Sequence, residues 1–143
     1  MIASKPLIAT ACLVVSLNAL ACKPLGLDTE VQFERGASTL TASNVRKLAH
    51  WHAVIAENFH GKGAYLGELK IAPSLGVSTH LTQQREGHLR LLLGQLGVKP
   101  DRIEIRIFAF RGSDPERADI AGIGFEPDCP NPCCPGPELR EKR

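Results

Sequence analysis

Alternating and helical patterns of apolar residues divide the middle of the chain into six expected elements. Apolar residues at every second position predict strands over residues 29–33, 65–72, 102–110 and 119–125. Apolar stripes at helical spacing predict one helix over residues 42–58 and a second that begins near Leu81 or Thr82 and ends at Gly97. The resulting β-α-β-α-β-β order predicts an α+β fold with two helices packed on one face of a small mixed sheet.

The first helix and the third strand have the clearest patterns. Thr41 or Ser43 is the expected N-cap of the helix, since a short hydroxyl side chain can accept a hydrogen bond from the first free amides. The apolar arc of this helix comprises Val45, Leu48, Trp51, Ile55 and Phe59. In the third strand, three isoleucines (Ile103, Ile105, Ile107) alternate with charged residues, which predicts one apolar and one polar face.

The first 21 residues have the pattern of a secretory signal peptide. Lys5 supplies the positive start, an apolar run follows, and the small residues Ala19 and Ala21 precede Cys22. This arrangement resembles a bacterial lipobox, in which Cys22 is acylated and becomes the mature N-terminus. Lys23 stands where an aspartate would resemble a signal for inner-membrane retention, so the outer membrane is the expected location. Cleavage after Ala21 with release, and an uncleaved anchor, are the alternatives.

Residues 22–28 are expected to form the lipid anchor and linker, and residues 29–127 a single domain. The net charge of +2 gives no reason to expect a nucleic-acid partner. The sequence has no nucleophile elbow and no phosphate-binding glycine loop, so an enzyme is not expected and no cofactor is predicted. His50 and His52 lie about 200° apart on a helix and cannot share one metal ion, so no metal site is predicted.

The tail, residues 128–143, combines prolines with three cysteines. Four prolines and one glycine between residues 129 and 137 exclude a helix there. In an oxidising envelope, Cys129 is expected to pair with Cys133 or Cys134, which leaves one thiol for an intermolecular bridge or a redox partner. Zinc binding by the three thiols is the weaker alternative, because no histidine lies nearby.

Four segments resemble OmpA-like domains. The opening resembles the V-x-F strand that leads through a loop of small residues to a leucine, and Leu81-Thr-Gln-Gln-Arg85 resembles the L-S-x-x-R motif at the start of the second helix. The opening motif is found in residues 31–40 and the helix motif in residues 81–85. Residues 97–103 resemble the G-[IV]-x-x-x-[RK]-[IV] segment that leads into the third strand, and residues 117–127 resemble a shortened closing strand.

The resemblance implies non-covalent binding of peptidoglycan. The family grips the two charged ends of a diaminopimelate side chain with an aspartate after the second strand and an arginine on the second helix. Arg85 matches that arginine, and Ser78 and Thr82 are the other implied ligand contacts. No aspartate lies between residues 66 and 85, and Pro73 takes the place of the family's acidic residue.

Arg85 also falls on the apolar arc of its helix, where a charge needs an explanation. A ligand, a buried carboxylate, or a side chain that snorkels along the surface would each supply one. The expected function is that of an outer-membrane lipoprotein facing the periplasm that links the membrane to peptidoglycan. The alternative is an OmpA-like domain that has lost peptidoglycan binding and contacts a protein partner of the envelope, because the acidic half of the pair is missing.

Overall fold

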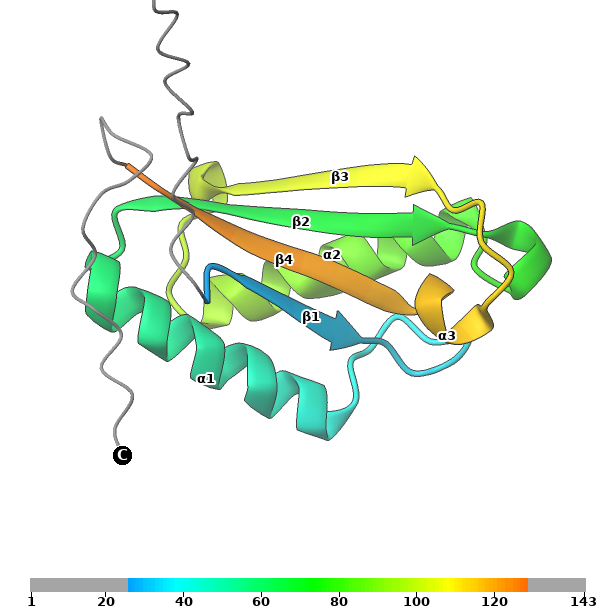
Figure 1. Cartoon of the computed structure of the whole chain (residues 1–143), viewed down its shortest axis with the longest axis horizontal. Coiled ribbons are helices and arrows are strands. Elements are labelled where there is room, and N and C mark those ends of the chain that lie inside the picture. The colour runs from blue at the N-terminus through cyan, green and yellow to red at the C-terminus, as the bar shows by residue number, and fades with distance from the viewer. Residues whose placement is uncertain (1–25, 129–143) are drawn as a thin grey trace, which may run out of the picture.

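The computed structural model describes residues 26–128, which form four strands, three α-helices and two short 3₁₀ turns (Figure 1). The predicted signal peptide, the lipidation site Cys22 and the tail cysteines Cys129, Cys133 and Cys134 lie outside this range. The elements are β1 (Asp28–Gln32), α1 (Ala42–Phe59), β2 (Gly63–Ile71), η1 (Pro73–Leu75), α2 (Thr79–Gln95), η2 (Pro100–Arg102), β3 (Ile103–Ala109), α3 (Pro115–Ala118) and β4 (Ile120–Pro127). The predicted α+β class and the predicted order of the main elements are confirmed.

The four strands form one mixed sheet in the order β1-β4-β2-β3. β4 runs antiparallel to both of its neighbours, whereas β2 and β3 are parallel. A parallel pair requires a crossover connection, and α2 supplies it. The register aligns Gly63 with Pro127, so the start of β2 and the end of β4 lie at one end of the sheet, called here the terminal end. Ile71 and Ile120 lie toward the opposite end.

The core lies between the sheet and the helices α1 and α2, which cover the same face (Figure 1). On α1, Leu48 and Ile55 are buried, and the other members of the predicted arc pack against the core from its margin. Leu89 and Leu93 do the same for α2. Residues on β2 and β4 alternate between this core and the open face of the sheet, which is the pattern of an antiparallel pair with one covered face.

Several boundaries differ from the sequence-based expectation. α2 begins at Thr79 instead of Leu81 or Thr82, because Ser78 is its N-cap and accepts a hydrogen bond from the amide of Leu81. Thr41, one of the two expected candidates, caps α1. β3 is an edge strand, so Ile103 is buried at its start but Ile107 is 37% exposed. Within residues 26–128, no helix is long and apolar enough to span a membrane.

Candidate functional site

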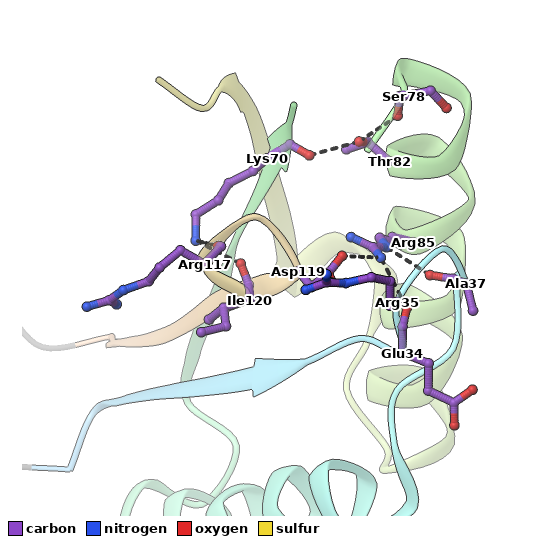
Figure 2. A network of polar contacts seen from close by, with 10 residues as sticks. All are labelled: Glu34, Arg35, Ala37, Lys70, Ser78, Thr82, Arg85, Arg117, Asp119 and Ile120. Atoms are coloured by element: carbon purple, nitrogen blue, oxygen red, sulfur yellow. Dashed lines mark hydrogen bonds and ion pairs between the residues drawn. The ribbon is translucent and has the colours of Figure 1, made fainter. Parts of the chain in front are cut away.

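Arg85 is fully enclosed at the end of the sheet opposite the terminal end (Figure 2). Its side chain is 2% exposed, although it is the largest charged side chain of the domain interior. Arg85 lies on the core-facing side of α2, three residues after Thr82. It points into the space between that helix, the loop after β1 and the start of β4. The position on the apolar arc therefore reflects true burial and not snorkelling.

The guanidinium of Arg85 is held by one carboxylate and two backbone carbonyls. Its Nη2 donates to Asp119 Oδ1 at 2.8 Å and to the carbonyl of Glu34 at 3.3 Å, and its Nε donates to the carbonyl of Ala37 at 2.9 Å. The guanidinium also lies over the ring of Phe33, 4.7 Å from the centroid. These groups satisfy a charge that would otherwise be very costly to bury.

Asp119 is the buried carboxylate that the position of Arg85 called for. It lies between α3 and β4, and its side chain is 5% exposed. Its second oxygen accepts a hydrogen bond from Nε of Arg35 at 3.2 Å, and Arg35 itself is 61% exposed. One carboxylate thus joins a buried and an exposed arginine, and we refer to Arg85, Asp119 and Arg35 as the Arg85 cluster.

Local structure fixes Asp119 in this place. Asp114 caps the single turn of α3 by accepting a hydrogen bond from the amide of Glu116, and Asp119 ends that turn. The carbonyl of Asp119 then accepts a hydrogen bond from the amide of Phe33, immediately before β4 pairs with β1. The backbone is therefore held on both sides of the carboxylate.

The other two predicted ligand residues are used by the fold. Ser78 is exposed, but its hydroxyl caps α2. Thr82 is completely buried, and its hydroxyl lies 2.9 Å from the carbonyl oxygens of both Lys70 and Ser78. This contact fastens the first turn of α2 to the end of β2 and so sets the depth of Arg85 three residues later.

Lys70 continues the network on the open face of the sheet. Its ammonium donates to the carbonyls of Arg117 at 2.8 Å and Ile120 at 2.9 Å (Figure 2). Burial lowers the pKa of Lys70, and the nearby charge of Arg117 acts in the same direction. The contact joins β2 to the segment that carries Asp119.

The position of Asp119 in the sequence is a sign that it could be a buried partner of Arg85, although it does not lie next to β2. The aspartate stands between Ala118 and Ile120 at the entry to an apolar strand, where a carboxylate must meet a partner if it is buried. Pro73, which takes the place of the family's aspartate, begins η1 and carries no charge. The missing carboxylate after β2 and the carboxylate before β4 are thus separate features of this chain.

Comparison with solved structures identifies the architecture. The OmpA-like domain of FopA1 from Francisella tularensis subsp. tularensis SCHU S4 aligns with a TM-score of 0.54 at 15% sequence identity, over 70% of this chain and 72% of that one. This chain has an OmpA-like fold. The periplasmic domain of Helicobacter pylori MotB (residues 97–256) aligns with a TM-score of 0.51 at 14% identity, over 71% of this chain and 81% of the other. No protein-family model and no curated protein matches the sequence.

In this OmpA-like fold, the Arg85 cluster combines two cations with one buried anion. Among residues 26–128, no group of three or more histidine, cysteine or acidic side chains is placed to hold a metal ion. The cluster instead presents two guanidinium groups and a carboxylate, which together can meet a carboxylate and an ammonium of a ligand.

Proposed function

We propose that this chain is a binding protein of the cell envelope, anchored to the outer membrane through Cys22, whose OmpA-like domain associates non-covalently with peptidoglycan. The OmpA-like fold and the match of Arg85 to the family's arginine support this proposal. The proposed role is binding, with no catalytic step.

The 2.8 Å pair between Arg85 and Asp119 carries the proposal. A zwitterionic ligand such as the free end of a diaminopimelate residue needs one cation for its carboxylate and one anion for its ammonium. Asp119 supplies the anion from the residue just before β4, whereas Pro73 begins η1 after β2. Asp119 therefore takes over the role of the aspartate that is absent after β2.

Binding at this pair is an exchange in which charge is conserved. The ligand carboxylate replaces Asp119 on Arg85, and the ligand ammonium replaces Arg85 on Asp119, so neither buried charge is left without a partner. A ligand with only one of the two charges would leave one member of the pair uncompensated, which costs about 3–5 kcal/mol. Arg35, 3.2 Å from Asp119 and 61% exposed, is the member of the cluster that an incoming carboxylate can meet first.

The burial of the same pair favours a second candidate function. At 2% and 5% exposure, Arg85 and Asp119 can also act as a fixed internal tie between α2 and β4. The domain would then have lost peptidoglycan binding and would contact a protein partner of the envelope. The two functions differ in whether a ligand can separate the pair.

Co-sedimentation with isolated peptidoglycan sacculi tests the first function. The chain from Lys23 onward should bind, and Asp119→Asn, which keeps the shape but removes the charge, should bind about tenfold more weakly or worse. Glu104→Gln is the matched control, since it removes a carboxylate from an exposed pair with Arg106 on the open sheet. Circular dichroism confirms that each variant is folded.

Competition with small ligands separates the two functions. Free diaminopimelate should displace the wild-type protein from sacculi, whereas pimelate, which has the two carboxylates but no ammonium, should not. Absence of wild-type binding would refute the peptidoglycan proposal and leave the protein-partner function. Binding that neither Asp119→Asn nor diaminopimelate weakens would place the contact elsewhere on the domain.

A further inference from the structure

A cavity of about 320 Å³ opens at the terminal end of the sheet, far from the Arg85 cluster. It lies where α1 ends, β2 begins and the turn after α2 leads into β3, and its lining includes Tyr65, Lys99 and Arg102. β4 is eight residues long, so about 24 Å separates this end from Asp119. A single diaminopimelate side chain at the Arg85 cluster cannot reach the cavity as well.

The charged side chains of the described lining are cations, and one of them, Arg102, is paired with Asp128. Lys99 and Arg102 carry permanent charges, His52 and His60 add two imidazoles, and none of the described lining residues has a carboxylate. Asp128 contacts only Nη1 of Arg102, at 2.7 and 3.0 Å, and leaves the rest of that guanidinium toward other partners. Within the described part of the chain, the ammonium of Lys99 forms no ion pair. We call this site the basic cavity.

The floor of the basic cavity is neutral and rigid. The hydroxyl of Tyr65 and Nδ1 of His52 are 2.8 Å apart, and both rings pack beneath the opening. Burial raises the pKa of Tyr65 to about 12, so its phenol stays protonated and adds no negative charge. The mouth is bordered by Gly61 and Gly97, and no atom lies within 4 Å of the position where either would carry a Cβ. The ammonium of Lys99 and the guanidinium of Arg102 therefore border the same open cavity as the uncharged phenol of Tyr65.

The size and charge of the cavity define its ligand. Its volume is at the low end of the range for small-molecule sites, so a compact group fits. Lys99, which immediately precedes η2 and has no ion-pair partner among the described residues, supplies the ammonium, and Arg102 supplies the guanidinium donors that Asp128 does not use. These donors match the oxygens of an anion such as a phosphate monoester. We propose that the basic cavity binds a phosphate group, either free or at the head of a lipid.

The lipid source follows from where the chain enters the domain. The indole of Trp51 donates a hydrogen bond to the carbonyl of Gly26 at 2.8 Å, which holds the first described residue at the terminal end. Cys22 lies four positions earlier, and four extended residues span about 14 Å. With the proposed anchor at Cys22, the terminal end and the basic cavity would lie near the membrane surface. This step rests on the proposed function, whereas the phosphate site itself does not.

Titration of the full chain with inorganic phosphate at constant ionic strength tests the site. Amide resonances of Gly61, Gly97 and Lys99 should shift and saturate, and Lys99→Gln should weaken binding about tenfold. The Lys99 side chain is exposed and forms no ion pair within residues 26–128, so Lys99→Gln is expected to leave the fold intact. Lys47→Gln, an exposed lysine on α1, is the charge-matched control. Shifts that do not saturate, or equal weakening by both variants, would overturn the proposal.

Vesicles identify the source of the phosphate. The same proteins are sedimented with vesicles of phosphatidylcholine alone or with added phosphatidylglycerol. Binding to the anionic vesicles that Lys99→Gln reduces and Lys47→Gln preserves supports a lipid headgroup. Phosphate binding without vesicle binding supports a free phosphate compound. Neither result depends on sacculus binding, so the basic cavity and the Arg85 cluster succeed or fail separately.

Discussion

Removal of one partner from the buried ion pair should destabilise the domain strongly. Asp119→Ala leaves the guanidinium of Arg85 in place at 2% exposure without its carboxylate. Breaking a buried pair in this way costs roughly 3–5 kcal/mol, because the remaining charge stays out of water with no counter-charge. That loss is a large part of the total stability of about 5–15 kcal/mol that a domain has.

The other contacts of Arg85 do not offset this cost. The carbonyls of Ala37 and Glu34 and the ring of Phe33 remain, but they are neutral groups. Arg35 also loses its partner, yet it is 61% exposed and water can solvate it, so it contributes little to the loss. The expected loss of stability therefore comes from the one buried charge, that of Arg85, which has lost its partner.

Urea unfolding at neutral pH, followed by the fluorescence of Trp51, measures the effect. Trp51 is the only tryptophan of the chain, so its signal has one source. Glu104→Ala is the matched control: its pair with Arg106 has the same 2.8 Å distance, but the two side chains are 56% and 69% exposed. The control should cost less than about 1 kcal/mol.

A double variant shows whether charge causes the loss. Arg85→Met in the Asp119→Ala background removes the unpaired cation, so the double variant should be more stable than Asp119→Ala alone, although two carbonyls lose a donor. Equal losses for Asp119→Ala and Glu104→Ala, or a double variant less stable than Asp119→Ala, would refute the reasoning.

Three other properties can be tested on the same protein. Gly87 and Gly94 lie on α2 with open space beside each, so replacing either with alanine should stabilise the domain by roughly 1 kcal/mol. Gly63→Ala should destabilise the domain, because the added methyl group would clash with a phenylalanine ring of β4. Equal shifts of the urea midpoint for the three variants would contradict this. Burial raises the pKa of Tyr65, the only tyrosine, to about 12, so tyrosinate absorbance of the folded chain should appear near pH 12. The unfolded chain ionises near pH 10, so the free energy of unfolding should decrease as pH rises from 10 toward 12. Ionisation near pH 10 without unfolding would contradict this prediction. Burial lowers the pKa of His52, although a hydrogen bond to the backbone of Leu96 acts to raise it. As pH falls below 6.5 the unfolded state therefore takes up a proton before the folded state does, and wild type should lose stability relative to His52→Gln. A constant stability difference between the two proteins from pH 8 to pH 5 would rule this out.

The patterns that predicted the fold are local ones. The arc of α1 and the alternation of the strands each follow from residues within one element, and both are found in the structure. The start of α2 was misplaced because Ser78 caps the helix before its apolar arc begins. α3 was missed because four residues are too few to show a helical period.

The candidate site depends on contacts that local patterns do not contain. Arg85 stood out because a charge lay on an apolar arc, and a buried carboxylate was one of three explanations. Its partner Asp119 is 34 positions away, and only the pairing of β4 with β1 and β2 brings the two together. The sequence could therefore show that Arg85 needed an explanation, but it could neither decide among the three nor identify Asp119 as the partner. The ligand roles of Arg85, Ser78 and Thr82 stay predictions.

The antiparallel register places the proposed anchor and the proposed ligand pair at opposite ends of the domain. Gly26 is tied to α1 at the terminal end, and Asp119 precedes the far end of β4, about 24 Å away. Under the proposed anchoring at Cys22, the Arg85 cluster would lie at the end of the sheet farther from the membrane. A protein that joins a membrane to a polymer beyond it needs this polarity. The same register leaves the basic cavity on the membrane side, where a phosphate headgroup would orient the domain without competing for the Arg85 cluster.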